Sequence, residues 1–363
     1  MTPIHAFTRV AACHVAPRFL SAQKTTEKAI SVVNQASRNG ANIIVFPESY
    51  ISAFPLWSAL RPPTENHDLF RRIVHESVYA DGPEIKALRD AARETKTVIS
   101  MGISEKAHAS TACLYNSNLL INIDGEVVIH HRKLMPTFFE KLTWSPGDGH
   151  GLKVADTPYG RVGGLICGEN TNPLARYALI AQREHIHISS WPSIWPTRVP
   201  KKVLGSESEF DPSSPAPRNY DNVLANRLRA AAHCFEAKAF GVMCSGFLDQ
   251  EAIDAVVEGS TTPEILQRAL QDSPRGVSMF LDPTGAPLPA FIVDEKTKTQ
   301  QSVEYLQNDE DIIYADMNLE DCIEGKQYHD VVGGYQRLDV FQLQVNRSRK
   351  DPVIFQEDSV SQE

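Results

Sequence analysis

The alternation of short apolar segments with amphipathic ones restricts the fold of this chain more than any other feature. Residues 8–15 and 42–46 are apolar runs with the length of buried strands, and residues 21–38 between them carry apolar side chains at helical spacing. The pattern repeats, because a helical segment at 83–95 precedes another apolar run at 97–102. Buried strands connected by helices are typical of layered α/β domains, so we expect that class of fold.

A tight hairpin interrupts this alternation. Asp124-Gly125 separates two strand-like segments, 114–123 and 126–132, and this dipeptide is a strong signal for a hairpin turn. An antiparallel pair beside helix-connected strands predicts a mixed sheet. Further along the chain, the same pattern predicts strands at 161–167, 185–190, 241–247 and 276–282 and helices at 173–182 and 221–240.

The domain organisation is predicted from where this pattern stops. Residues 199–219 are rich in Ser and Pro and poor in apolar residues, which predicts a surface insertion. Beyond about residue 320 the periodicity fades, and the last residues are polar. We therefore expect one domain over residues 1–320 and a partly flexible C-terminal extension over residues 321–363.

Charge and hydropathy exclude two classes of partner. The chain has 36 Lys and Arg against 45 Asp and Glu, with no strongly basic stretch, which argues against nucleic-acid binding. No segment approaches the ~18 consecutive apolar residues that a membrane helix needs. We therefore expect a globular protein that binds neither nucleic acid nor membrane.

The cysteines bear on the cellular compartment. The chain has six, with no C-x-x-C pair and no dense framework, as in a protein whose thiols stay reduced. Arg9, Arg18 and Lys24 precede the first acidic residue, Glu27, which leaves a mitochondrial presequence as an alternative. Residues 9–15 fit a first strand better, so we expect a cytoplasmic protein.

Three polar residues stand at the ends of predicted strands: Glu48, Lys133 and Cys167. Ligands of α/β domains bind where strands end, so these side chains can meet in one pocket. A thiol attacks as its thiolate, a carboxylate can accept its proton, and an ammonium group offsets the negative charge that develops. Taken singly, the same residues also fit a turn glutamate, a solvated lysine and a small core cysteine.

The local sequences around these residues favour the catalytic interpretation. Phe46-Pro-Glu-Ser49, the block from His131 to Glu140 with Trp144-Ser-Pro-Gly-Asp-Gly149, and Gly164-Leu-Ile-Cys-Gly-Glu-Asn170 stand in this order. They resemble the three catalytic blocks of the nitrilase superfamily of carbon–nitrogen hydrolases, and the long lysine block looks like the nitrilase branch. The resemblance extends over residues 8–320.

The resemblance implies a fold and a role for each motif residue. The fold would be a four-layer α-β-β-α sandwich. Cys167 would be the nucleophile, Glu48 the general base and Lys133 the cation that stabilises tetrahedral intermediates. Glu140 would be a second carboxylate that positions the base or the attacking water. No metal and no organic cofactor are implied.

The activity implied is hydrolysis of a nitrile to the carboxylic acid and ammonia, through a thioimidate and a thioester on the cysteine. Two alternatives remain, a relative that acts on an amide or on cyanide, and a non-enzymatic assembly protein that keeps the fold. The resemblance also implies self-association, as a dimer or a longer spiral, with the helix at 173–182 at the interface.

Other residues near the motifs have less specific interpretations. Many nitrilases carry Trp after the nucleophile, whereas this chain has Gly168, which would remove an aromatic wall from the site. Glu169 would point to the same side as Cys167 on an extended backbone, where it would tune the thiol, but a hydrogen-bonding role in the loop is favoured. Aromatic side chains that would line a substrate pocket are Phe54, Trp57 and Trp191.

Histidines raise the question of a metal. His185 and His187 share one face of a predicted strand, and His130-His131 are neighbours in sequence. No cysteine or carboxylate completes a recognisable zinc spacing around them, so we expect no metal site.

Overall fold

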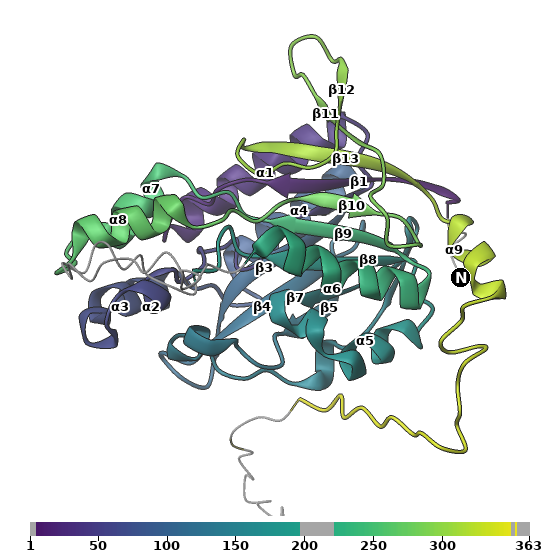
Figure 1. Ribbon diagram of the computed structural model, residues 1–363. Helices are drawn as coiled ribbons and strands as arrows, with labels where there is room; N and C mark the ends of the chain where they lie inside the picture. The colour runs from purple at the N-terminus through teal and green to yellow at the C-terminus, as the bar shows by residue number, and fades with distance from the viewer. Residues whose placement is uncertain (1–4, 197–220, 350–352, 354–363) are drawn as a thin grey trace, which may run out of the picture.

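The computed structural model describes residues 5–196, 221–349 and 353, so the insertion predicted at 199–219 lies outside the described residues. In the described part, two β-sheets pack face to face with helices on their outer sides (Figure 1). The strand pattern predicted one mixed sheet, whereas the strands divide into two. The architecture is the four-layer α-β-β-α sandwich that the resemblance implied.

The larger sheet has the strand order β12-β11-β13-β1-β2-β3-β4-β5, and the smaller sheet has the order β10-β9-β8-β7-β6. The larger sheet consists of β1 (Phe7–His14), β2 (Ile43–Val45), β3 (Val98–Lys106), β4 (Leu114–Ile121), β5 (Val127–Arg132), β11 (Ala290–Val293), β12 (Gln300–Val303) and β13 (Asp311–Asn318). The smaller sheet consists of β6 (Ala155–Thr157), β7 (Gly160–Ile166), β8 (Ile186–Trp191), β9 (Phe240–Ser245) and β10 (Met279–Leu281). The predicted hairpin is confirmed as the antiparallel pair β4–β5.

Helices cover both outer faces and extend from one end. The α-helices are α1 (Ala22–Arg38), α2 (Trp57–Leu60), α3 (His67–Glu76), α4 (Pro83–Thr95), α5 (Pro173–Ile180), α6 (Asn222–Ala237), α7 (Gln250–Val257), α8 (Pro263–Asp272) and α9 (Asp321–Glu324). Short 3-10 helices are η1 (Pro63–Glu65), η2 (Phe138–Leu142), η3 (Gly149–Gly151), η4 (Cys167–Thr171) and η6 (Gly325–Gln327). Among the described residues, no helix is both long and apolar enough to span a membrane.

Strand β1 illustrates how side chains are shared between the layers. Ala11 and Cys13 pack toward α1 and α4, whereas Val10 and Ala12 pack toward the smaller sheet. All four are fully buried. Because both faces of this strand are covered, its sequence is a continuous apolar run rather than an alternating one.

The second half of the chain contributes elements that the sequence pattern did not predict. Helices α7 and α8 and strands β11 to β13 were all missed. Strand β13 pairs antiparallel with β1 along its whole length, with Phe7 opposite Asn318 and His14 opposite Asp311. Such a pairing joins the two ends of the domain, and no local sequence signal reports it.

The C-terminal extension begins after the last strand. After η6 the chain has no further helix or strand among the described residues up to 349, and it runs outside the body of the sandwich (Figure 1). It contacts the body again from Val345, which packs against the apolar cluster that includes Leu152, to Arg349, whose guanidinium Nε lies 2.9 Å from an oxygen of Asp148. Arg349 also donates to the carbonyl of His130, so the extension contacts the segment on each side of Lys133.

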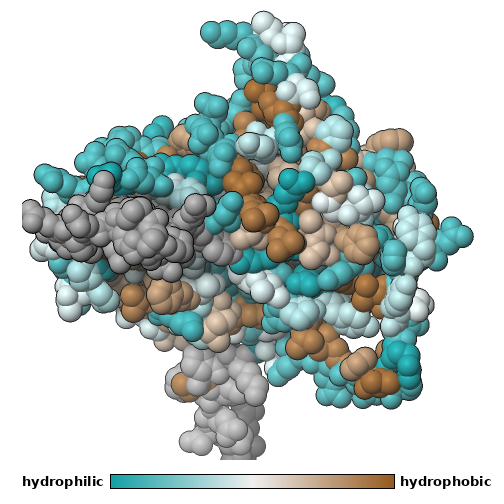
Figure 2. All heavy atoms as spheres, in the orientation of Figure 1, coloured by the Kyte–Doolittle hydropathy of each residue, from teal (hydrophilic) through white to brown (hydrophobic). Residues whose placement is uncertain are grey.

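Several large apolar side chains remain exposed on α5 and α6. Leu174 of α5 is 61% exposed, and Leu224 and Leu228 of α6 are 65% and 69% exposed. Figure 2 shows hydrophobic groups in the middle of the face on which α6 lies in Figure 1. A spacing of four residues places Leu224 and Leu228 on one side of the helix.

A glycine permits the backbone to approach closely beside Glu48. A Cβ atom on Gly102 of β3 would lie 2.6 Å from the amide nitrogen of Ser49 and would also overlap the carbonyl of Pro47. The backbone on both sides of Glu48 therefore rests directly on β3, and only glycine leaves enough room there.

We expect Gly102→Ala to destabilise the protein by about 1–3 kcal/mol, because the methyl group must displace backbone rather than a flexible side chain. The displaced segment carries Glu48, so chemistry that depends on Glu48 should fall with it. Urea denaturation monitored by tryptophan fluorescence measures the stability. Gly334→Ala is the matched control, since its nearest neighbour would lie at 3.4 Å. Equal midpoints for the two variants would contradict this account of the close approach.

Candidate active site

Four residues singled out from the sequence meet where the two sheets join. Glu48 follows β2 and Lys133 follows β5 of the larger sheet, while Cys167 follows β7 of the smaller one. Glu140 lies in η2. None of the four is more than 7% exposed. A carboxylate oxygen of each glutamate and the Cys167 sulfur lie within 4.8 Å of one another.

The Lys133 ammonium group lies at the centre of this cluster. Its Nζ donates to Glu48 Oε1 at 2.8 Å and to the two oxygens of Glu140 at 2.9 and 2.7 Å, and all three side chains are completely buried. Burial by itself lowers the pKa of a lysine, but the electrostatic interactions with Cys167, Glu140 and Glu48 outweigh burial and raise the pKa of Lys133 well above its ordinary value. The ammonium group therefore stays charged.

Glu48 has one bound oxygen and one free oxygen. Asn116 of β4 donates to Oε1 at 2.7 Å, beside the lysine. Among the described residues, Oε2 has no hydrogen-bond partner. Burial, and secondarily the charge of Glu140, raise the pKa of Glu48 to about 7 against the opposing effect of Lys133. Glu48 can thus exchange a proton near neutral pH through its free oxygen.

Glu140 has a different environment, because both of its oxygens already have partners. Oε2 accepts the backbone N–H of Thr137 at 3.0 Å in addition to the lysine contact. This carboxylate both caps η2 and contacts the Lys133 ammonium group that Glu48 also binds. The geometry suits a group that orients the ammonium ion.

Cys167 is the first residue of η4 and has a backbone φ of 52°, in the left-handed region. A non-glycine residue in that region is strained and needs support from its surroundings. The Asn170 side chain provides such support, because Nδ2 donates to the Cys167 carbonyl at 3.0 Å. Burial, and then the charge of Glu48, raise the pKa of the Cys167 thiol well above its ordinary value, while Lys133 lowers it. The resting sulfur is therefore a protonated thiol.

Glu169 does not lie on an extended backbone, because β7 ends at Ile166 and the chain turns at once into η4. Its carboxylate accepts the N–H of Leu134 at 2.5 Å, the N–H of Ile166 at 2.8 Å and a bond from His131 Nε2 at 2.9 Å. Burial alone raises the pKa of Glu169, but His131 and these two backbone N–H groups lower it overall. The loop hydrogen-bonding interpretation fits, since Glu169 connects the segments that carry Lys133 and Cys167.

A cavity opens at the Cys167 sulfur. Its lining residues are Thr137, Cys167, Gly168, Trp191, Pro192, Trp195, Asn222, Asn226 and Arg229. Trp191 thus lies beside Cys167. The three polar residues from α6 were not singled out from the sequence, because no local pattern connects a helix more than fifty residues further along the chain with the cysteine turn.

The other two aromatic residues lie elsewhere. Phe54 packs against Trp195 with ring centroids 6.1 Å apart and lines a second cavity together with Glu48. Trp57 lines a third cavity with Phe70 and is only 1% exposed. Trp191 therefore lies beside Cys167. Phe54 contacts Trp195, which lines the same cavity, and Trp57 lines a different cavity.

The space beside Gly168 is filled from another segment. A Cβ atom on Gly168 would lie 2.8 Å from Thr137 Oγ1. The glycine removes an aromatic side chain from this position, as expected, but the gap does not stay open. Thr137 approaches the turn instead and presents a hydroxyl group to the cavity.

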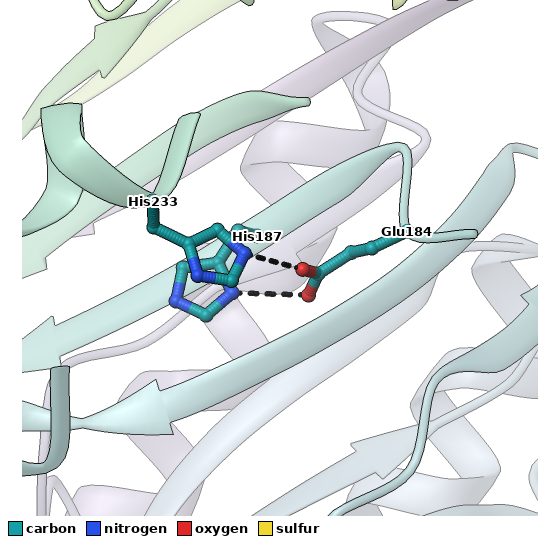
Figure 3. Close-up of side chains that lie close together, drawn as sticks. All are labelled: Glu184, His187 and His233. Atoms are coloured by element: carbon teal, nitrogen blue, oxygen red, sulfur yellow. Dashed lines mark hydrogen bonds and ion pairs between the residues drawn. The ribbon is translucent and has the colours of Figure 1, made fainter. Parts of the chain in front are cut away.

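In the described part of the chain, two groups of side chains have metal-ligating atoms within 4.8 Å of one another. In the first, which consists of Glu48, Glu140 and Cys167, the Lys133 ammonium group already binds both carboxylates. The second consists of Glu184, His187 and His233, behind the cysteine turn (Figure 3). His185, which the sequence analysis paired with His187, contacts Arg161 instead.

Comparison with known proteins adds independent evidence. The carbon-nitrogen hydrolase family matches residues 9–327. The chain is 32% identical over 358 residues to a protein named nitrilase from Penicillium rubens, with 98% of each chain covered. It is 30% identical over 348 residues to a protein named arylacetonitrilase from Hypocrea virens, with 95% of this chain and 93% of that protein covered.

A solved structure supports the fold. The crystal structure of a carbon-nitrogen hydrolase from Helicobacter pylori G27 has a TM-score of 0.63 to this structure at 17% sequence identity, and the match covers 93% of this chain and 97% of that one.

Proposed function

Because this chain belongs to the carbon-nitrogen hydrolase family, we propose that it hydrolyses an organic nitrile to the carboxylic acid and ammonia. The proposal rests on the contacts among the buried side chains of Glu48, Lys133, Glu140 and Cys167. A protonated thiol at Cys167 lies near the carboxylate of Glu48, which has one unpartnered oxygen, and a cation at Lys133 contacts both carboxylates. Relatives named nitrilase and arylacetonitrilase, which match nearly the whole chain, favour a nitrile as the substrate.

The first half of the reaction forms a covalent intermediate. Glu48 Oε2 accepts the Cys167 proton as the sulfur attacks the nitrile carbon, and the proton passes to the nitrile nitrogen to give a thioimidate. A water molecule then adds to the same carbon, and the tetrahedral adduct expels ammonia to leave a thioester. Lys133 stabilises the negative charge that develops at each addition, in a site where little water competes.

The second half releases the acid. A second water molecule attacks the thioester with Glu48 as general base, and the tetrahedral adduct returns the thiol and the carboxylic acid. Glu140 keeps the ammonium group oriented throughout. The balance is one nitrile and two waters consumed for one acid and one ammonia, and the protein groups supply every proton transfer without a metal or an organic cofactor.

The cavity beside the cysteine is the proposed substrate site. Trp191 offers an apolar face there, while Thr137 and the α6 amides offer hydrogen bonds. Phe54 acts on the pocket through Trp195, which it contacts. Trp57 contributes least, because its own cavity is a separate one.

The alternatives differ in their products. An amide-directed relative would release ammonia from amides at least as fast as from nitriles, and a cyanide-directed one would leave an amide product. A non-enzymatic assembly protein has no physical need for a buried ammonium ion between two carboxylates beside a thiol, since burying these charges costs stability. The nitrile proposal accounts for all three groups.

We expect Cys167→Ser to abolish turnover while the protein stays folded. A serine hydroxyl is much harder to deprotonate than a thiol, and the proposed base, Glu48, is a weakly basic carboxylate. An ammonia-release assay over aliphatic, aromatic and arylacetic nitriles and their amides measures activity, and chromatography of acid and amide identifies the product. Cys322→Ser, at another buried cysteine, is the control and should stay active. Nitrile hydrolysis by the Cys167 variant would refute the mechanism.

The pKa of about 7 at Glu48 predicts an acid limb in the pH profile. The base form of Glu48 is required, so kcat/KM should fall about tenfold per pH unit below pH 7. The charge of Glu140 contributes to the raised pKa, so Glu140→Gln should move the limb to lower pH and also lower the plateau. A limb that stays at the same pH in this variant would contradict the assignment of Glu48 as base.

We also propose that the chain self-associates through α5 and α6. The sequence analysis placed the interface on the helix at 173–182. Within that helix Ala178 and Ile180 are buried inside the chain, whereas Leu174 is exposed, as are Leu224 and Leu228 on α6. Helix α6 also lines the substrate cavity, so pairing there would steady one wall of the site.

Leu228→Asp should shift the protein from an oligomer toward a monomer, because a charge in a paired apolar face leaves a desolvated carboxylate. Light scattering against the 40.3 kDa mass of one chain measures the state. Tyr305→Asp, at an exposed aromatic residue after β12, is the control and should leave the mass unchanged. A fully active wild-type monomer at dilute concentration would contradict this proposal.

We also propose a cytoplasmic location and a division of the chain into a hydrolase domain and a C-terminal extension. All six cysteines are free thiols, which supports a cytoplasmic location. The division into a hydrolase domain over residues 1–320 and an extension over residues 321–363 agrees with the position of the last strand, which ends at Asn318.

A further inference from the structure

Behind the cysteine turn lies a second buried cluster that the proposed reaction does not use. Glu184 Oε1 contacts His187 Nδ1 at 3.0 Å, and Glu184 Oε2 contacts His233 Nε2 at 2.6 Å (Figure 3). The three side chains are at most 1% exposed. They lie between the smaller sheet and α6, where Gly163 of β7 leaves the room that the Glu184 carboxylate occupies.

The geometry does not suit a metal ion. The rings of His187 and His233 are stacked, with centroids 3.6 Å apart and planes inclined by 22° (Figure 3). An imidazole ligand binds a metal with a lone pair that lies in its ring plane. Two nearly parallel planes at this separation cannot both contain one ion, so the cluster is held together by protons.

The hydrogen bonds assign those protons. Asn170 Nδ2 donates to the carbonyls of Leu165 and Cys167 at 3.2 and 3.0 Å, so its Oδ1 must be the acceptor that faces His187 Nε2 at 2.9 Å. His187 therefore lies between two acceptors, Glu184 and Asn170, and carries a hydrogen on both ring nitrogens.

His233, in contrast, is a neutral imidazole. Its Nδ1 has no hydrogen-bond partner among the described residues, as expected for a ring protonated only at Nε2. Burial, and then the charge on His187, lower the pKa of His233 to about 4, so it is neutral at pH 7. Burial alone would raise the pKa of Glu184, but the two histidines lower it to about 2. The cluster is thus one carboxylate, one imidazolium and one neutral imidazole.

The side-chain amide of Asn170 connects this cluster to the nucleophile Cys167. The Asn170 Oδ1 atom accepts hydrogen bonds from His187 Nε2 and from the Ser189 hydroxyl, each at 2.9 Å. Its side-chain nitrogen donates to the carbonyl of Cys167, whose backbone is in the left-handed region, so the bonds that fix Asn170 also hold the cysteine turn. Without a fixed Asn170, the carbonyl of Cys167 loses the partner that holds the left-handed turn.

We propose that His187 is a positioning residue for the nucleophile, which holds the Cys167 turn in its reactive geometry through the hydrogen bond to Asn170, with Glu184 and His233 as its buried support. Its effect on turnover rests on the proposed nitrile hydrolysis. Its effect on the cysteine turn does not depend on the identity of the substrate.

Two amide substitutions separate the two bonds of His187. The nitrogen of a glutamine side chain reaches the place of Nε2, so His187→Gln keeps the bond to Asn170 and loses the one to Glu184. The nitrogen of an asparagine side chain reaches the place of Nδ1, so His187→Asn keeps the bond to Glu184 and loses the one to Asn170. Both variants remove the charge equally.

We expect kcat of His187→Asn to fall about 10²-fold, the usual effect of a displaced reacting group, and kcat of His187→Gln to stay within about tenfold of wild type. KM should change little in either. The melting temperature should follow the opposite order, with His187→Gln the less stable because Glu184 loses a partner. A purely structural histidine would make activity follow stability, and that order, or unchanged kcat in both variants, would overturn the proposal.

Glu184→Gln is a second and milder test if the histidine variants fail to fold. Once His187 is neutral and protonated only at Nε2, the glutamine amide can donate to His187 Nδ1 and accept from His233 Nε2, so every bond to Asn170 survives. Its kcat should stay within about threefold of wild type, and a folded variant with a 10²-fold loss would overturn the hydrogen-bond account. His14→Gln, at a buried histidine bonded to Ser278 and Gln307, is the matched control that should lose stability and keep kcat.

The rate of Cys167 alkylation by iodoacetamide, followed by mass spectrometry, separates this proposal from the proposed function. If wild type turns over no nitrile, the proposed function fails, and alkylation alone decides about His187. Slower alkylation in His187→Asn than in His187→Gln supports the positioning role. Equal rates in the two variants overturn it.

Discussion

The buried ion cluster around Lys133 is the interaction on which the rest of the site depends. Taking an ammonium ion and two carboxylates out of water costs several kcal/mol per ion, and the cost is offset only while all contacts are made together. The structure makes them at 2.7–2.9 Å, with side chains that have no solvent exposure. Displacement of any one member leaves an uncompensated charge, so the strands that carry them must keep a fixed register.

The two-sheet architecture supplies that register. Glu48 and Lys133 come from the larger sheet and Cys167 from the smaller one, so Cys167 and its charged neighbours are held by different layers. Glu169 connects the two layers, because its carboxylate accepts backbone N–H groups next to both Lys133 and Cys167. The distance between thiol and ammonium ion is thus a property of how the sheets pack, and no single loop determines it.

The sequence predicted those parts of the site that lie in local motifs. Glu48, Lys133 and Cys167 stand in short blocks whose order is visible along the chain, and the structure brings them together. Asn116 and His187 were not foreseen as partners of these residues, because their contacts join segments that lie far apart in sequence. For the same reason the pairing of β13 with β1 was missed, and an alternation of apolar runs could not tell one sheet from two.

The protonated resting state of Cys167 has a consequence for the lifetime of the protein. Peroxides and other oxidants attack a thiolate far faster than a thiol, and they need access to the sulfur. A cysteine that is only 7% exposed and keeps its proton until a substrate arrives offers little of either. Reactivity is then conditional on a bound molecule that can take up the proton as the carbon–sulfur bond forms. Between turnovers, Cys167 should therefore react with oxidants more slowly than an exposed thiolate would.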